Sequence, residues 1–171
     1  PILMPWLDKV DAVLWAGIPG QEGGHAVAAT LFGDVEPAGR LVTSFPAADG
    51  ASPAWNVTPT EGNLTYEEGP YIGYKGFYAG RAPAPLFWFG HGLGYGSWAY
   101  GAPTLVAVEP APEVSVAITN TSARPSREVV QVYFDPANGE AVRLAGWAAA
   151  TVAPGETSEV QVSCDPRMFR R

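Results

Sequence analysis

The stretch Asp11-Ala12-Val13-Leu14-Trp15-Ala16-Gly17 is a short, almost fully apolar run that ends before Pro19-Gly20. Such a run is typical of a strand that is buried on both faces in a parallel sheet. Residues 21–32 predict a helix, because their apolar residues recur at four-residue spacing and Gly33 follows as a stop signal. Residues 40–45 predict a second strand. Together these segments indicate a βαβ piece of an α/β domain.

One βαβ unit cannot cover both faces of its own sheet. We therefore expect the rest of that sheet, and the true N-terminus, to lie before residue 1. Pro1-Ile2-Leu3-Met4 agrees with this expectation, since it resembles the end of a buried strand. The absence of a targeting signal then carries no information, so the compartment stays open, with a lean towards the cytoplasm.

The middle of the chain, residues 47–101, is irregular and rich in glycine, proline and aromatic residues. Long irregular segments in compact proteins are usually binding loops or straps between domains. We therefore predict an aromatic, Gly/Pro-rich inter-domain strap here, after an N-terminal piece that covers residues 1–46.

Apolar residues alternate with small or polar ones in three later segments, so each segment has one face suited to burial. Turn-like sequences separate these segments. Several short strands at this spacing predict a small antiparallel β-sandwich over residues 102–171. Whether the last strands of that sandwich lie within the chain stays open. The alternating apolar residues are Val114, Val116, Ile118, Val130, Val132, Phe134, Val160 and Val162.

The composition excludes several classes of function. The net charge is −7 and there is no run of Lys or Arg, which argues against nucleic acid as a partner. No apolar stretch is long enough to span a bilayer. Cys164 is the single cysteine, which excludes an internal disulfide and a cysteine-based zinc site. With only two histidines a histidine-rich metal site is not expected either, and no cofactor is predicted.

Four clusters of residues, in the same order along the chain, resemble glycoside hydrolase family 3. The first resembles the end of the family's second domain, the second its following strap, the third the aromatic entry into the last domain, and the fourth the fibronectin type III-like domain. Lys75 replaces the family's usual Arg, and Gly94 replaces a common Ser. The clusters are Pro19-Gly20-Gln21-Glu22-Gly23-Gly24 with residues 31–34, 37–41 and 43–46; Tyr66-Glu67-Glu68-Gly69 with Gly73-Tyr74-Lys75; residues 85–95; and residues 120–121, 128–133, 143–147 and 154–156.

The resemblance implies a larger retaining enzyme that hydrolyses β-linked glucosides, xylosides or related sugars. It implies a (β/α)8 barrel, an α/β sandwich domain and an immunoglobulin/fibronectin III-like sandwich, of which this chain holds the last part. A barrel Asp serves as nucleophile and a Glu of the second domain as acid/base, about 5 Å apart as retention requires. Both positions precede this segment in the family. We therefore assign no catalytic residue here, and we expect the chain alone to be inactive, with the missing barrel as its partner and a β-linked glucoside or oligosaccharide as substrate of the whole enzyme.

A few residues are candidates for a role in the site. Glu67 and Glu68 are adjacent, so in an extended segment they point to opposite faces and cannot form a retaining pair. Glu68 and Trp88 are retained as candidates for the edge of a substrate pocket. For Trp88 and its aromatic neighbours, packing between domains is favoured over stacking on sugar rings. Glu22, at a helix start, and the two histidines are interpreted as structural.

Two other observations leave alternatives open. Asn56, Asn63 and Asn120 each begin a glycosylation triplet, and such triplets matter only in a eukaryotic secretory context. Cys164 is interpreted as a small buried hydrophobe. The main alternative function is a free-standing carbohydrate-binding or adhesion module built on the sandwich, although such a module would not need residues 10–45. A third possibility is a structural remnant that docks onto a separately encoded barrel.

Overall fold

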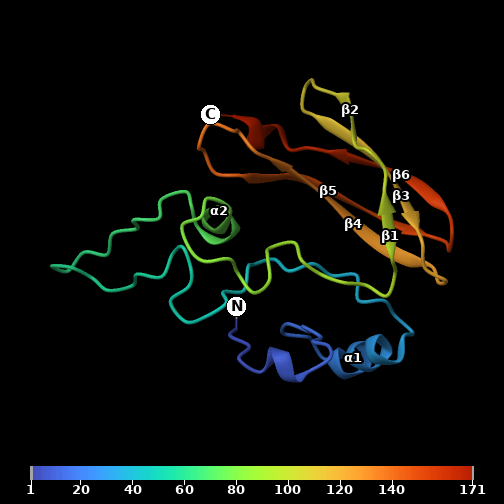
Figure 1. The fold of residues 1–171 in the computed structure, drawn as a ribbon, viewed down its shortest axis with the longest axis horizontal. Coiled ribbons are helices and arrows are strands. Elements are labelled where there is room, and N and C mark those ends of the chain that lie inside the picture. Colours follow the sequence, from blue (N-terminus) through green and yellow to red (C-terminus); the bar gives the residue numbers. More distant parts are fainter. Residues whose placement is uncertain (1, 171) are drawn as a thin grey trace.

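The computed structural model describes residues 2–170, and most of its regular structure lies in two antiparallel β-sheets (Figure 1). The larger sheet contains β1 (Trp98–Tyr100), β2 (Thr104–Ala107), β3 (Glu113–Asn120) and β6 (Thr157–Ser163). The smaller sheet pairs β4 (Ser126–Phe134) with β5 (Arg143–Val152). The chain is therefore mostly β, with few helices.

Strand β3 is the centre of the larger sheet. It pairs with β6 along one edge, where Val116 lies opposite Val160 and Val114 opposite Val162. Its other edge is shared, because β2 pairs with the first half of β3 and β1 with the second half. All of these pairs are antiparallel, although only β2 and β3 are consecutive strands joined by a short connection.

The hydrophobic core lies between the two sheets, which pack face to face. Val116, Ile118, Val160 and Val162 from the larger sheet meet side chains of the smaller sheet. Each buried valine or isoleucine contributes about 1.5–3 kcal/mol relative to an exposed one. The alternation seen in the sequence is therefore confirmed as a two-sheet packing. The partners on the smaller sheet are Val130 and Val152, with Val132, Ala148 and Ala150 at the margin.

Asn120 ends β3 and is completely buried. Its amide nitrogen donates to the carbonyl oxygens of Arg124 at 2.8 Å and Val152 at 2.9 Å. Its side-chain oxygen accepts from the Ser122 backbone N–H at 3.0 Å and from the Ser122 hydroxyl at 2.6 Å. A buried amide with all these partners joins the end of β3 to the end of β5 without leaving a polar atom unsatisfied.

The N-terminal part carries a 3-10 turn, η1 (Leu7–Lys9), and helix α1 (Gly23–Phe32). Gly33 follows α1 with a left-handed φ of 82°, and its N–H donates to helical carbonyls. The predicted helix over residues 21–32 and its glycine stop are therefore confirmed, with a start two residues later. Three short helical elements were not predicted: η1, α2 (Gly73–Tyr78) and the 3-10 turn η2 (Pro166–Phe169).

The two strands predicted at residues 11–17 and 40–45 differ from the structure. Within residues 2–170, the first segment has no ladder, and the second makes a single bridge, between Phe45 and Phe87. A strand exists only when a neighbour completes its hydrogen bonds. No described segment lies beside residues 11–17 in that way. The prediction of a paired strand at residues 11–17 is therefore wrong for the described chain.

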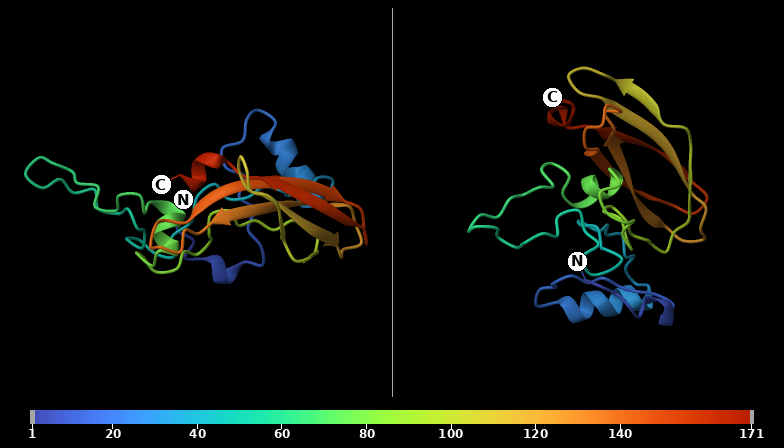
Figure 2. Two further views of the ribbon diagram at one scale, coloured as in Figure 1. Left: turned by 90° about the horizontal axis from the view of Figure 1, so that it is seen from above. Right: turned by 60° about the vertical axis from the view of Figure 1, so that its left-hand side comes forward.

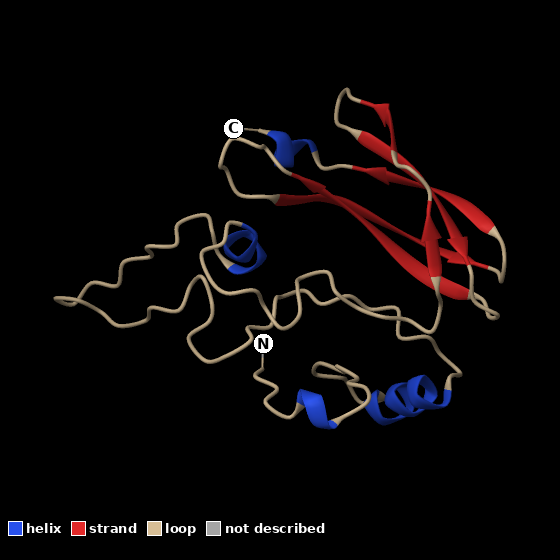
Figure 3. Ribbon diagram, viewed as in Figure 1, coloured by secondary structure: helices blue, strands red, loops and turns tan. Residues whose placement is uncertain are grey.

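The chain forms three layers in space. Residues up to about 35 lie on one side, the irregular strap crosses the middle, and the sandwich lies on the other side, as the views of Figures 1 and 2 agree. Figure 3 shows that strands are confined to the sandwich, while the other two layers hold loops and the larger helices. Among residues 2–170 no helix is both long and apolar enough to cross a membrane.

Candidate functional site

The middle layer is held to the sandwich by an ion pair between Arg40 and Glu128. Their side chains lie 2.7 Å apart and are only 11% and 12% exposed. Glu128 also accepts from the Val129 N–H at 2.9 Å, and Arg40 donates to the Gly39 carbonyl at 3.1 Å. Partial burial, then the charge of Glu128 and a hydrogen bond to it, raise the pKa of Tyr100 to about 12.

A second contact across the same boundary is made by Glu36. One carboxylate oxygen accepts from the backbone N–H groups of Tyr95 at 3.0 Å and Gly96 at 3.1 Å. The other oxygen accepts from the N–H of Arg127, the second residue of β4, at 2.6 Å. The Glu36 carboxylate therefore has a structural role, because its three hydrogen bonds hold residues 95–96 and the start of β4 together.

Residues 39–41 run beside residues 90–92 and complete this boundary. The Leu41 N–H donates to the His91 carbonyl at 2.8 Å, and the Gly90 N–H donates to the Leu41 carbonyl at 2.8 Å. The approach is close, since a Cβ added to Gly92 would lie 2.3 Å from the Gly39 carbonyl oxygen. The Gly90 carbonyl accepts from Gln131 of β4 at 2.9 Å. Glycine is required at position 92 because two backbones meet there.

An aromatic cluster joins α2, the strap and β4. Tyr74 stacks on Phe89 with ring centroids 4.6 Å apart, and its hydroxyl accepts from the Leu144 N–H at 2.9 Å. Tyr133 lies against the same cluster, where burial, then its tyrosine neighbours, raise the pKa of Tyr133 to about 12. Aromatic pairs of this kind contribute about 0.5–1.5 kcal/mol beyond the area that they bury. The cluster therefore packs α2 and residues 88–89 against β4 and β5.

The two candidates for a pocket edge lie in different parts of the strap. Trp88 is half-buried and packs on Tyr78 and Phe77, at centroid distances of 4.8 Å and 6.2 Å. Glu68 is half-buried, and its carbonyl accepts from the Tyr71 N–H at 3.0 Å. Within residues 2–170 no hydrogen bond or ion pair involves the Glu68 carboxylate or joins the two residues. Their place at a substrate pocket stays a prediction.

The structural roles of the other residues weighed in the sequence stay predictions. Glu22 is at the N-cap of α1, but its carboxylate contacts the exposed His25 ring at 2.5 Å and caps no backbone N–H. The His91 ring lies 5.2 Å from the Phe87 ring. Cys164 is free and buried, and burial raises the pKa of its thiol. No three metal-ligating side chains cluster anywhere in the described part of the chain.

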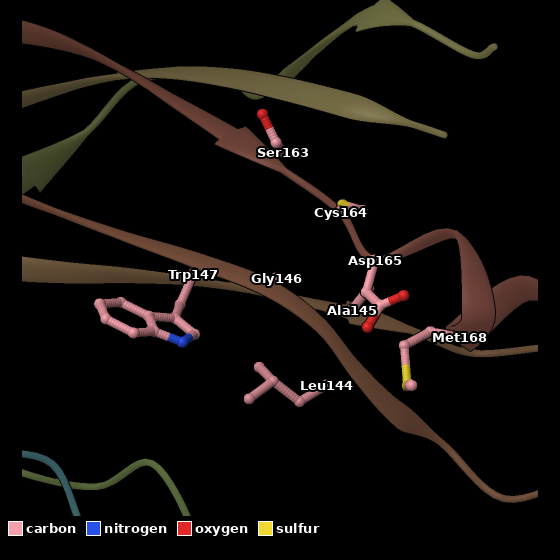
Figure 4. A pocket seen from close by; sticks show the side chains of 8 residues that line it. All are labelled: Leu144, Ala145, Gly146, Trp147, Ser163, Cys164, Asp165 and Met168. Atoms are coloured by element: carbon pink, nitrogen blue, oxygen red, sulfur yellow. The ribbon is translucent and has the colours of Figure 1, made fainter. Parts of the chain in front are cut away.

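Two open cavities lie on the surface. One, of about 380 Å³, lies between the start of β5 and the end of β6, and Figure 4 shows Trp147 and Leu144 on one side of β5, with Met168 coming from η2. The other, of about 320 Å³, lies between residues 42–44 and the part of the strap that holds the start of α2 and Phe89, and Lys75 is its one basic residue. Neither cavity holds a pair of carboxylates. The second cavity is lined by Val42, Thr43, Ser44, Ile72, Gly73, Tyr74, Lys75 and Phe89.

The boundary contacts of Glu36, Arg40, Arg124 and Glu128 were not singled out from the sequence. Arg124 donates to the Gly33 carbonyl at 2.8 Å and lies over the Tyr95 ring, so it closes the end of α1 onto the sandwich. The sequence shows only that these charged residues lie within Gly-rich or apolar segments. It does not reveal their partners, because Arg40 and Glu128 are 88 residues apart and Gly33 and Arg124 are 91 residues apart.

Comparisons with known proteins agree on one family. The profile of the glycosyl hydrolase family 3 C-terminal domain matches residues 1–95. A β-glucosidase of Rhizobium radiobacter is 41% identical over 98% of this chain and 22% of its own length. Thermostable β-glucosidase B of Acetivibrio thermocellus is 35% identical over 99% of this chain and 23% of its own length. The chain thus spans about a fifth of the length of these relatives.

Solved structures give the same answer. The β-glucosidase DesR of Streptomyces venezuelae, in complex with D-glucose, superposes with a TM-score of 0.87 at 38% identity over 96% of this chain and 22% of that one. β-Glucosidase 3B of Thermotoga neapolitana, in complex with glucose, gives a TM-score of 0.84 at 30% identity over 93% of this chain and 23% of that one. The chain therefore belongs to glycosyl hydrolase family 3, and it corresponds to the C-terminal part of the family's β-glucosidases.

Proposed function

We propose that this chain is the C-terminal portion of a retaining β-glucosidase-type enzyme that acts on β-linked glycosides. In this proposal residues 1–46 complete an α/β sandwich domain, residues 47–101 form a strap, and residues 102–171 form a fibronectin type III-like domain. The role of the segment is domain packing. The catalytic nucleophile and acid/base belong to the preceding part of the enzyme.

The observation that carries this proposal is the apolar surface of the N-terminal layer. Phe32 is 85% exposed and Leu31 is 65% exposed, although both belong to the apolar pattern of α1. The apolar run at residues 11–17 is exposed as well, with Trp15 at 48%. So many exposed large apolar side chains in one layer are typical of an interface. A neighbouring part of an α/β domain would cover it and supply the missing strand ladders.

The carboxylates of the chain support a packing role rather than a catalytic one. Retention requires two carboxyl groups about 5 Å apart, one ionised and one protonated. Glu36 and Glu128 are instead occupied by backbone N–H groups and by Arg40. Glu67 and Glu68 are adjacent in the turn at residues 67–70, and not in the extended segment that the sequence suggested.

Hydrolysis of an aryl β-glucoside tests the proposal. The purified chain is assayed alone and after mixing with the portion of the Rhizobium radiobacter β-glucosidase that precedes the aligned region. We expect no turnover above buffer from either piece alone and turnover from the mixture. Turnover by this chain alone would refute the proposal, as would the lack of activity and of association in the mixture.

The same mixture tests the two candidate residues. If Trp88 or Glu68 lies at the edge of the substrate pocket, Trp88→Ala or Glu68→Gln raises the KM of the mixture while its assembly is unchanged. A change in assembly alone assigns the residue to packing.

Trp147 favours one alternative, a carbohydrate-binding module. This residue is 62% exposed on β5 and borders the cavity of about 380 Å³ beside Met168 (Figure 4). An exposed tryptophan face suits the apolar face of a pyranose ring. Titration with cello-oligosaccharides, followed by tryptophan fluorescence, distinguishes the functions. Saturable micromolar binding that Trp147→Ala abolishes would support the module.

A further inference from the structure

Residues 51–70, here named the projecting loop, extend away from the three layers in both Figure 1 and Figure 2. The tip of the loop is well defined. Thr60 and Asn63 exchange two backbone hydrogen bonds, at 2.8 Å and 2.9 Å. Between them Glu61 and Gly62 both have positive φ, at 50° and 79°. This is the geometry of a tight two-residue hairpin turn, so the tip of the loop has a defined backbone conformation.

The two limbs behind this tip do not build a core of their own. Trp55 is 49% exposed, Val57 76% and Tyr66 74%. The Thr60–Asn63 bridge is the only β-pairing within the described loop. A self-supporting surface loop packs its own side chains inside it. This loop instead presents large apolar side chains outward on limbs without a ladder, which suits packing against an external surface.

The charge of the projecting loop is one-sided. Residues 51–70 contain Glu61, Glu67 and Glu68 and no Lys or Arg. Potentials across an interface are complementary, so a surface that receives this loop carries basic residues around an apolar centre. Another acidic surface is disfavoured. The whole chain has a net charge of −7, which makes a second copy a poor partner.

We propose that the projecting loop docks, through Trp55, Val57 and Tyr66, into an apolar groove with a basic rim on the polypeptide that precedes residue 1. This inference rests on the proposed function. The Rhizobium radiobacter relative is between four and five times as long as the aligned segment, since the segment covers 22% of its length. The N-terminal end of the described chain lies near the base of the loop (Figures 1 and 2), so the preceding polypeptide is within its reach.

The mixture of this chain with the preceding portion of the Rhizobium radiobacter β-glucosidase tests the docking. The measured quantity is the concentration of this chain that gives half-maximal β-glucosidase activity. The loop variant is Trp55→Ser with Tyr66→Ser. The matched control is Leu105→Ser with Val106→Ser, which removes two exposed apolar side chains from β2. We expect the half-saturating concentration to rise tenfold or more for the loop variant, with unchanged maximal activity, and to stay within twofold for the control.

A charge variant tests the basic rim independently. Glu61→Lys with Glu67→Lys is compared with Glu156→Lys, in the exposed turn before β6. We expect only the loop variant to weaken association, with a larger effect at low salt than at high salt. Circular dichroism and thermal unfolding of each variant confirm that it is folded.

Each outcome decides between the proposals. If the wild-type chain associates, and the loop and control variants have equal half-saturating concentrations, the docking inference alone is wrong. No association of the wild-type chain overturns the proposed function and the docking with it. If sedimentation shows a wild-type homodimer that the loop variant loses, while association with the preceding portion is unchanged, the loop docks on a second copy and the inference is wrong.

Discussion

Arg40 and Glu128 form an ion pair at 2.7 Å that joins the segment around Arg40 to strand β4 of the sandwich, and both side chains are almost buried. A buried pair of this kind adds little stability over apolar residues of the same size, but loss of one partner leaves an unpaired buried charge. The pair therefore contributes specificity more than stability, because it fixes the position of residues 38–41 against β4.

We expect Arg40→Met to destabilise the chain by about 3 kcal/mol, because it leaves the Glu128 carboxylate buried without its cation. The double variant Arg40→Met with Glu128→Met removes both charges and is expected to recover most of that loss. Urea unfolding measures the free energies. Equal losses for the single and double variants would show that packing of the Arg40 side chain, and not its charge, stabilises the boundary.

Two neighbouring glycines provide a matched pair. A Cβ at position 92 would lie 2.3 Å from the Gly39 carbonyl oxygen, whereas a Cβ at position 39 meets no atom within 4 Å. We expect Gly92→Ala to cost about 2 kcal/mol by forcing two backbone segments apart. Gly39→Ala is expected to change stability by less than about 0.5 kcal/mol. Similar unfolding midpoints for both variants would contradict the close approach of these segments.

The pH dependence of η2 follows from Asp165. Hydrogen bonds from the Arg167 side chain, then from its backbone N–H, lower the pKa of Asp165 to about 2. An aspartate in the unfolded chain titrates near about 3.9. The stabilisation is therefore complete above that value and is lost as the pH falls towards 2. We expect Asp165→Asn to lower the Tm at pH 7 and to match the wild type near pH 2. A Tm difference that persists unchanged at pH 2 would rule out the ionic contact as its cause.

The three glycosylation triplets differ in accessibility. Asn56 and Asn63 are exposed on the projecting loop, whereas Asn120 is fully buried and bonded on both sides of its amide. Attachment of a glycan needs a free amide nitrogen at the surface. When the chain is secreted from a glycosylating yeast, we expect glycans at Asn56 and Asn63 and none at Asn120. Peptide mapping by mass spectrometry checks this, and a glycan on Asn120 in folded material would contradict the structure.

Local sequence patterns were sufficient to predict the helix of the N-terminal layer and the buried face of the sandwich strands. The helix over residues 21–32 and its stop at Gly33 depend on spacing along one segment, and the structure confirms both. The alternation at Val116 and Ile118 likewise predicted which side chains are buried. By contrast, α2 was missed because Gly73 and Gly76 weaken its helical signal, and its place depends on contacts of Tyr74 with Phe89 and β5.

The sequence by itself determined the family, the two-sheet sandwich and the helix of the N-terminal layer, because apolar periodicity and motif order are properties of short segments. Only the tertiary structure decided that residues 11–17 and 40–45 lack ladders, that Glu36 clamps three N–H groups, and that Arg40 meets Glu128. Ladders and ion pairs need partners far away in the sequence, and the energy of each depends on distance and burial. No pattern within one segment encodes those quantities.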